Sequence, residues 1–362
     1  MDSRSSSLRE MCLQVTNSCP LRCTHCSTRG GLPFSGELTT EEIFAVLKDF
    51  SNLGGRIVEL SGGEPLVHPD IIKIIELASS LDLEVRLYTS GTIGYSDGLA
   101  AAPSPSQWVS LYHAGISKVF FNLQGPDADH HEPITRIPGS FNAVKRSIGL
   151  AKNAGMFVGV HFVPMKPNFA SFKATVEMSK SLGADEVALL RFVAQGRGQD
   201  NRDSLLLDSE QFSWLLQEAI SVRKEVYGIR VRIGCPFNHR LLLGDGGDPA
   251  HCGAGEEICH VRSTGEVLPC SAFQQGFIVL GNVRERTLRD LWHERAWTRF
   301  RILRSRGEVP GSLDFTLQTG EPCIAQIASG TNAGRDVGLP PGERLHFIEQ
   351  TEQNEKERCP QD

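Results

Sequence analysis

The stretch TNSCPLRCTHCSTRGG, residues 16–31, places Cys19, Cys23 and Cys26 on one short segment of the chain. Three residues separate the first two cysteines, two separate the next pair, and no fourth cysteine follows within the segment. Thiolates bind iron–sulfur clusters or zinc, and structural zinc takes four protein ligands. Three clustered thiolates therefore indicate an open coordination position. The alternative is a zinc site completed by His25 or by a distant residue.

The composition is that of a globular protein. The chain has 362 residues, of which 40% are hydrophobic and 22% charged, and its net charge is −6. This length predicts one large domain or two modest ones. No basic run suggests a nucleic-acid partner, and no apolar run approaches the roughly 18 residues of a membrane helix. The N-terminal sequence has no apolar segment of a secretory signal, so we expect a cytoplasmic protein.

Ten cysteines are many for a cytoplasmic chain, where disulfides are disfavoured. Clustered thiols there favour metal or redox chemistry. The first group is close to the N-terminus, and Cys12 in it lies on a predicted strand and is expected in the core. The second group comprises Cys235, Cys252, Cys259, Cys270, Cys323 and Cys359.

Strand-like and helix-like segments alternate over residues 10–200, in about six βα units. The segment TTEEIFAVLKDFSNLGG illustrates the helical pattern: Thr39 and Glu42 form a capping box, and apolar residues recur every three to four positions. Such alternation predicts a parallel sheet, as a partial barrel or a doubly wound sheet. In both folds, ligands bind where strands end and helices begin, which is where the three cysteines lie.

The remaining chain is less regular. Residues 1–9 are expected to be a flexible N-terminus and residues 201–234 a bridging helix and strand. Residues 235–341 are rich in glycine, proline and cysteine, and we expect a metal to stabilise them. Residues 342–362 form a polar tail.

The segment CPLRCTHC, residues 19–26, resembles the signature of the radical S-adenosylmethionine (SAM) enzymes. The resemblance covers roughly residues 10–200 and implies a partial (β/α)6 TIM-like barrel. It implies that Cys19, Cys23 and Cys26 hold a 4Fe–4S cluster whose free iron binds SAM. Reductive cleavage of SAM would release a 5′-deoxyadenosyl radical that abstracts hydrogen from the substrate, with an electron donor such as flavodoxin or ferredoxin.

A second landmark, SGGEP, resembles the GGEP motif of the same family, whose backbone binds the methionyl amino group of SAM. It contains Gly62, Gly63, Glu64 and Pro65 at the end of the second predicted strand. Glycines allow close approach of the main chain, and the glutamate can support the turn. The alternative reading is an ordinary strand–helix turn.

Weaker resemblances mark later strand ends. Ser90 ends the third strand, Asn122 and Gln124 end the fourth, and Gln195 closes the sixth. Arg136 is a plausible partner for the carboxylate of SAM. Each of these residues also has a structural alternative, such as capping a loop or pairing with a helix terminus.

The C-terminal cysteines resemble the auxiliary-cluster domains called SPASM and twitch. Twelve residues separate Cys252 from Gly265, and four separate Gly265 from Cys270. The resemblance implies one auxiliary 4Fe–4S cluster held by Cys252, Cys259, Cys270 and Cys323, because the further cysteines of a full SPASM domain are missing. A zinc site on the same thiols is the alternative.

Relatives with this architecture mostly modify peptides or proteins by crosslinking, epimerisation or oxidation, and we expect the same here. No N-terminal extension suggests a precursor-binding module, so the peptide would dock directly or through a separate precursor-binding protein. The alternatives are a dehydrogenase or epimerase of a small molecule such as an aminoglycoside-like sugar, and a non-catalytic iron–sulfur or zinc scaffold. Cys235 could be a ligand, a hydrogen-atom donor or a buried thiol. The sequence singles out no catalytic base.

Overall fold

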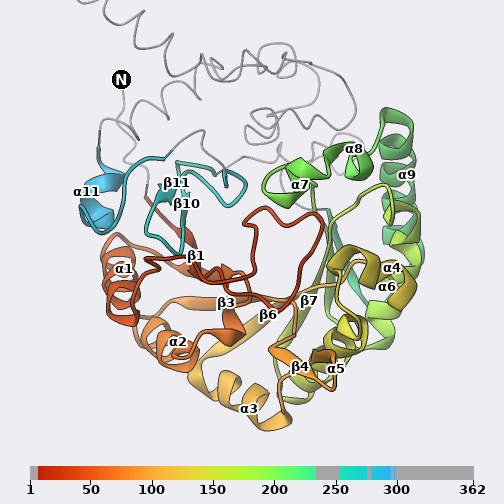
Figure 1. The fold of residues 1–362 in the computed structure, drawn as a ribbon, viewed down its shortest axis with the longest axis horizontal. Helices are drawn as coiled ribbons and strands as arrows, with labels where there is room; N and C mark the ends of the chain where they lie inside the picture. Colours follow the sequence, from red (N-terminus) through yellow and green to blue (C-terminus); the bar gives the residue numbers. More distant parts are fainter. Residues whose placement is uncertain (1–6, 234–252, 275–278, 295–296, 298–362) are drawn as a thin grey trace, which may run out of the picture.

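A nine-stranded sheet organises the computed structural model, which describes residues 7–233, 253–274, 279–294 and 297. The strands are β1 (Glu10–Thr16), β2 (Ile57–Gly62), β3 (Glu84–Thr89), β6 (Ile116–Asn122), β7 (Phe157–Phe162), β8 (Glu186–Leu189), β9 (Arg230–Ile233), β10 (Ile258–Val261) and β11 (Val267–Leu268). Their order is β11-β10-β1-β2-β3-β6-β7-β8-β9 (Figure 1). All neighbours pair in parallel except β10 and β11.

One long helix follows each of the first six large strands and covers the outer face of the curved sheet (Figure 1). These helices are α1 (Thr40–Asn52), α2 (Ile71–Ser80), α3 (Pro105–Ala114), α5 (Ser140–Asn153), α6 (Phe172–Ser181) and α9 (Ser209–Glu225). This arrangement confirms the predicted α/β partial barrel. Its sixth helix, α9, lies in the segment 201–234 that was expected to bridge to the C-terminal region.

Local signals explain where these helices begin. At α1, the Glu42 N–H donates to Thr39 Oγ1 at 3.2 Å, and the Thr39 N–H donates to Glu42 Oε2 at 2.8 Å. This reciprocal pair satisfies two N–H groups that the first turn leaves without partners. The face of α1 turned to the sheet is buried, as the apolar spacing predicts: Ile43, Val46, Leu47 and Phe50.

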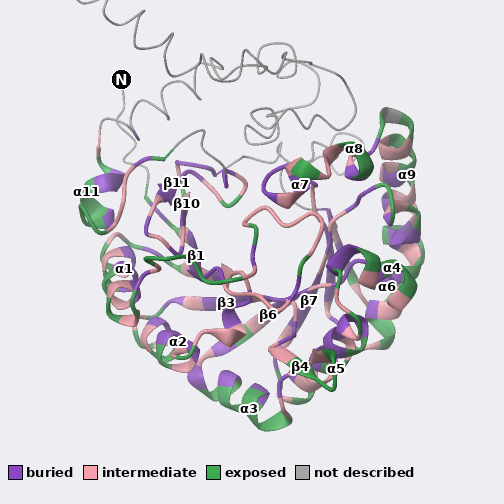
Figure 2. Cartoon of the chain, viewed as in Figure 1, coloured by how far each residue is buried: buried purple, intermediate pink, exposed green. Residues whose placement is uncertain are grey.

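The core lies between the sheet and the helices. On β3, Val85 and Leu87 are at most 1% exposed and pack outward, whereas Arg86 and Tyr88 face the barrel interior. Fully burying one such aliphatic side chain stabilises the fold by roughly 1.5–3 kcal/mol. Figure 2 shows buried residues on the sheet and exposed residues on the outer faces of α1 and α3.

Several short elements were not expected. The segment between β3 and α3 contains a hairpin of β4 (Gly94–Ser96) and β5 (Leu99–Ala101). Asp97 and Gly98 form its turn with φ angles of 52° and 77°, as a two-residue Asp-Gly hairpin loop requires. The other additions are α4 (Ala128–Thr135), α7 (Arg197–Asp200), α8 (Arg202–Leu205) and the 3-10 turns Pro65–Val67 and Phe169–Ser171.

The described C-terminal residues continue the sheet, since β10 pairs with β1. They are joined to α1 by Arg284, which donates to both carboxylate oxygens of Glu42 at 2.7 and 2.9 Å. This region also contains the short helix α11 (Leu288–Trp292). None of the described helices is long and apolar enough to cross a membrane. The following residues of interest lie outside the described part: Cys235, Cys252, Cys323, Cys359 and the tail at 342–362.

Candidate active site

A cavity of about 380 Å³ opens at the carboxyl ends of the central strands. This is the edge at which parallel α/β sheets bind ligands. Residues 16–31, here called the cysteine loop, form part of its wall together with the ends of β2, β3, β6 and β7. The predicted site residues that line the cavity are Cys19, Cys23, Cys26, Gly62, Gly63, Ser90 and Asn122.

The three loop cysteines share this cavity. The Gly30 N–H donates to Cys26 Sγ at 3.3 Å. Burial raises the pKa of Cys19 to about 12 and also raises that of Cys23, while the Arg197 guanidinium lowers both. Such thiols stay protonated until a metal supplies compensating charge, because metal ligands must be deprotonated.

The described side chains around this cavity do not form a site for a single metal ion. In the described part of the chain, no three His, Cys, Asp or Glu side chains are arranged to hold one metal ion. Each cysteine of a 4Fe–4S cluster binds a different iron, so its sulfurs stand further apart than the ligands of one zinc. His25 also lines the cavity but does not complete a zinc site with the three cysteines.

The SGGEP turn packs directly on the cysteine loop. The Gly63 N–H donates to the Thr16 carbonyl and the Glu64 N–H to the Ser18 carbonyl, both at 2.7 Å. A Cβ on Gly63 would collide with the Ser18 carbonyl oxygen, so only glycine fits. Gly62 has φ 146°, which also favours glycine. The turn therefore presents bare main chain to the cavity beside the cysteines.

Glu64 lies behind this turn and is fully buried. Its Oε1 accepts from the Leu66 N–H at 3.1 Å and from Thr89 Oγ1 at 2.6 Å. Its Oε2 accepts from the Ser90 N–H at 2.7 Å and from Ser90 Oγ at 2.6 Å. Burial raises the pKa of Glu64, and these hydrogen bonds act against that shift. The carboxylate ties the end of β2 to the end of β3, and it is absent from the cavity lining.

Asn122 and Gln124 take different positions. Asn122 lines the cavity, while Gln124 is fully buried behind it and donates to Asn122 Oδ1. Gln124 Oε1 accepts from the Val163 N–H at 3.1 Å, and the Gln124 N–H donates to His131 Nδ1 at 3.1 Å. Gln124 therefore orients Asn122 and does not itself reach the cavity.

Arg136 and Gln195 are not brought to the cavity. Arg136 is exposed at the end of α4, where φ is 64°. Gln195 is 1% exposed, and its side-chain carbonyl accepts from the Gln274 N–H behind the wall. The structure therefore does not support a direct cofactor contact for either residue.

The cavity also has an aromatic floor that the sequence reading did not assign to the site. The rings of Tyr88 and Phe120 stack with centroids 5.0 Å apart, and Phe120 and His161 stack at 5.0 Å. Burial lowers the pKa of His161 to about 3, so this imidazole is neutral near pH 7. Cys12, expected in the core, and His260 complete this level of the cavity. These five residues lie on β10, β1, β3, β6 and β7. Side chains alternate between the two faces along each strand, so this pattern could have grouped them on one face, although it does not tell which face looks inward.

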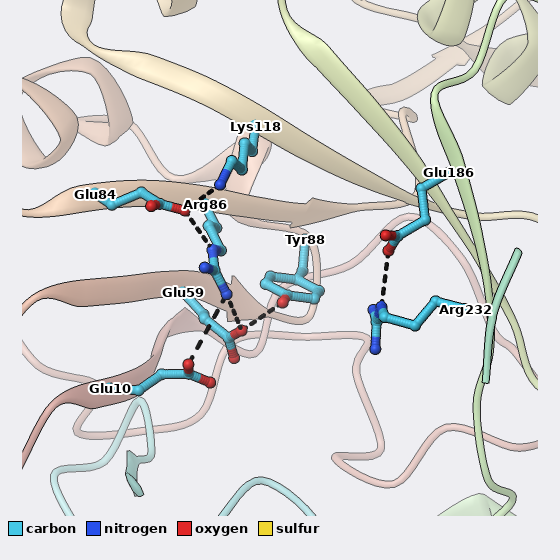
Figure 3. Close-up of polar contacts among 8 residues, drawn as sticks. All are labelled: Glu10, Glu59, Glu84, Arg86, Tyr88, Lys118, Glu186 and Arg232. Atoms are coloured by element: carbon cyan, nitrogen blue, oxygen red, sulfur yellow. Dashed lines mark hydrogen bonds and ion pairs between the residues drawn. The ribbon is translucent and has the colours of Figure 1, made fainter. Parts of the chain in front are cut away.

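Tyr88 also contacts a network of charged side chains (Figure 3). The Tyr88 hydroxyl donates to the Glu59 carboxylate, and Arg86 lies 3.8 Å from Glu59 Oε1. Glu84 bridges Arg86 at 2.7 Å and Lys118 at 2.8 Å. Burial, with the nearby Glu10 carboxylate, raises the pKa of Glu59 to about 8. Tyr88 thus connects the cavity to a partly buried network of titratable groups.

The C-terminal cysteines separate in the structure. Cys259 is fully buried in the hydrophobic core, and its neighbour His260 on β10 lines the cavity. Because side chains alternate along a strand, the Cys259 thiol faces away from the cavity. Cys270 lies after β11 and is half-buried. The expected ligand role of Cys259 is therefore not supported, whereas that of Cys270 remains a prediction.

Comparisons with known proteins agree with this geometry. The family model of the radical SAM superfamily matches residues 13–178, and that of the SPASM iron–sulfur cluster-binding domain matches residues 252–312. A PqqA peptide cyclase from Methylorubrum populi is 30% identical over 287 residues, which cover 77% of this chain and 70% of that protein. The chain belongs to the radical SAM superfamily.

Two further likenesses extend over most of the chain. An AdoMet-dependent heme synthase from Methanosarcina barkeri is 27% identical over 329 residues, covering 86% of this chain and 89% of that protein. The structure of anSMEcpe with bound AdoMet and Cp18Cys peptide matches with a TM-score of 0.67 and 18% identity, covering 96% and 97% of the two chains. The second likeness shows the shared fold.

Membership of this superfamily, with a SPASM region, makes the protein an iron–sulfur enzyme. Its cofactors are a 4Fe–4S cluster that binds SAM, auxiliary iron–sulfur clusters and SAM itself. The expected radical SAM resemblance is thereby confirmed.

Proposed function

We propose that this radical SAM enzyme abstracts a hydrogen atom from a peptide or protein, which is then crosslinked, epimerised or oxidised. The observation that carries the proposal is the meeting of the cysteine loop and the SGGEP turn at one cavity. Cys19, Cys23 and Cys26 would hold the cluster and leave one iron open for SAM. The bound cluster and SAM supply the one-electron chemistry that produces the hydrogen-abstracting species.

The chain itself binds and orients SAM. Because Gly62 and Gly63 carry no Cβ, the turn packs against the backbone of the cysteine loop, and its main-chain carbonyl groups would bind the methionyl ammonium group. Glu64 holds Ser90 at the cavity wall, and Gln124 orients Asn122 there. Pro65 starts the following 3-10 turn, where its missing N–H costs nothing.

The cavity of about 380 Å³ is large enough for SAM, because drug-sized ligands commonly fill about 300–1,000 Å³. The preference for a peptide substrate rests on the relatives of this chain. The similarity to PqqA peptide cyclases supports the same substrate class.

A small-molecule substrate is the second candidate. The similarity to AdoMet-dependent heme synthases, which covers 86% of this chain, favours it. Such a small molecule would bind in the same cavity as the peptide, beside the same cofactors. An aminoglycoside-like sugar is one further member of this small-molecule class.

The remaining cofactors and partners complete the proposal. Cys270, with Cys252 and Cys323 outside the described residues, would hold one auxiliary cluster. A flavodoxin or ferredoxin would supply the reducing electron. A separate precursor-binding protein would deliver the peptide if it does not dock directly.

The test has two stages. Anaerobically reconstituted protein with dithionite should cleave SAM to 5′-deoxyadenosine, Cys23→Ala should abolish cleavage, and the core variant Cys259→Ala should retain it. Absence of cleavage in the wild type would remove the proposal, including its enzyme class. Co-expression with short peptides encoded beside the gene, followed by mass spectrometry, then decides the substrate. Turnover of a tetrapyrrole or sugar with every peptide unchanged would favour the second candidate.

A further inference from the structure

Helix α7 begins with a basic residue that binds the main chain of the cysteine loop. Arg197 Nε donates to the Cys23 carbonyl at 2.8 Å, and Arg197 Nη1 donates to the Gly30 carbonyl at 2.8 Å. The Arg197 N–H also donates to the Cys26 carbonyl at 2.9 Å. One residue thus holds three points of the loop, each on or close to a cysteine.

The sequence around Arg197 permits this close approach. Gly196 has φ 55°, and a Cβ there would collide with the carbonyl oxygens of Cys26 and Ser27. A Cβ on Gly198 would lie 3.1 Å from the His25 carbonyl oxygen. Glycine on both sides of the arginine therefore allows the two backbones to pack against each other.

The guanidinium group brings a positive charge as well as hydrogen bonds. Arg197 lines the cavity with the three cysteines, and its charge acts on the thiols of Cys19 and Cys23. A fixed cation close to a cluster favours its more negative, reduced form. By contrast, the neighbouring pair of Arg29 and Asp200, 2.6 Å apart, is about half exposed to solvent.

We propose that Arg197 is a positioning residue that fixes the cysteine loop in its ligand geometry and, with the cluster bound, raises the cluster's reduction potential. The loop-fixing role depends only on contacts in the protein. The effect on the potential rests on the proposed function. A forked guanidinium suits the first role because it can bind two carbonyl groups at fixed spacing, which an ammonium group cannot do.

Two variants separate the two roles. Arg197→Lys keeps the charge and loses the fork, and Arg197→Gln loses both. Amide hydrogen exchange of the metal-free protein should accelerate within residues 19–31 by about tenfold in both variants, because charge-assisted hydrogen bonds are lost. Arg29→Gln, which breaks an exposed ion pair between the same two segments, should change exchange less than about threefold. Unchanged exchange in both Arg197 variants would overturn the loop-fixing role.

The potential is measured on reconstituted protein by a redox titration followed with electron paramagnetic resonance. At a fixed potential, Arg197→Gln should lower the ratio of reduced to oxidised cluster about tenfold. In Arg197→Lys this ratio should stay within about threefold of wild type. Equal ratios in wild type and Arg197→Gln would overturn the charge effect. A wild type that takes up no cluster would instead refute the proposed function and the charge effect with it, and hydrogen exchange would still decide the loop-fixing role.

Discussion

Replacing Glu64 with glutamine tests how the carboxylate supports the site. Oε1 accepts from the Leu66 N–H and Oε2 from the Ser90 N–H, with one hydroxyl donor on each oxygen. A glutamine amide must place its NH2 group at one of these two positions. Whichever way it turns, one backbone N–H then faces another donor and loses its acceptor, while the hydroxyl can rotate to accept.

The loss of stability follows from the number of hydrogen bonds that Glu64→Gln breaks. A buried donor without a partner costs about 1–3 kcal/mol, and the remaining hydrogen bonds lose the strength that the charge gave them. Relief of the buried charge offsets part of this loss, since burial raises the pKa of Glu64. We expect Glu64→Gln to lower stability by about 2–4 kcal/mol, and Tm by roughly 5–10 °C. Binding of SAM should weaken as well, because Ser90 lines the cavity.

Differential scanning fluorimetry and a SAM titration measure these two effects. Glu76→Gln is the matched control, because it makes the same chemical change on an exposed position of α2. Its Tm should stay within about 2 °C of wild type, as for surface substitutions generally. If Glu64→Gln has the same Tm as the control variant and binds SAM as tightly as wild type, the carboxylate does not support the turn and this reasoning is wrong.

Three further predictions test other parts of the structure. Gly63→Ala should displace the cysteine loop, because the added Cβ meets backbone oxygen atoms of that loop. It should lower the iron content of reconstituted protein at least about twofold. Gly149→Ala is the control and should leave the iron content unchanged, because a Cβ there has no atom within 4 Å. The folded-state pKa of Glu59 is about 8 against an ordinary 4.5, so its contribution to stability is complete below pH 4.5 and is lost as pH rises to about 8. Glu59→Gln cannot ionise, and its Tm should therefore fall less than that of wild type between pH 5 and 8; parallel Tm curves would contradict this. In a colorimetric iron analysis, Cys259→Ala should keep the iron content of wild type and lose only stability, whereas Cys270→Ala should lose about half of the iron. Loss of iron in Cys259→Ala but not in Cys270→Ala would restore Cys259 as a ligand.

Much of the fold was readable from the sequence because its signals are local. The capping box of Thr39 and Glu42 marks the start of α1, and alternation on β3 separates Val85 and Leu87 from the inward residues. These patterns depend on residues within one or two turns of each other. The hairpin at Asp97 was missed although Asp-Gly is a known turn signal, because the small residues around it resemble a loop.

The meeting of the cysteine loop with the SGGEP turn was also predictable. Both segments follow strands, and the carboxyl ends of neighbouring parallel strands lie at the same edge of a sheet. Direct pairing of β1 with β2 brings them together. The sequence therefore determined the family, the fold class and one side of the cavity.

Only the tertiary structure decided which distant residues complete that cavity. Arg197 meets Cys23 across 174 positions of sequence, and Cys259 turns into the core while its neighbour His260 enters the cavity. Periodicity tells which residues share a face of a strand, but it does not tell which face looks inward or which segment packs on it. Which face looks inward and which segment packs on it depend on the register between strands and on the path of the chain after β8. Both are stabilised by contacts between residues far apart in sequence.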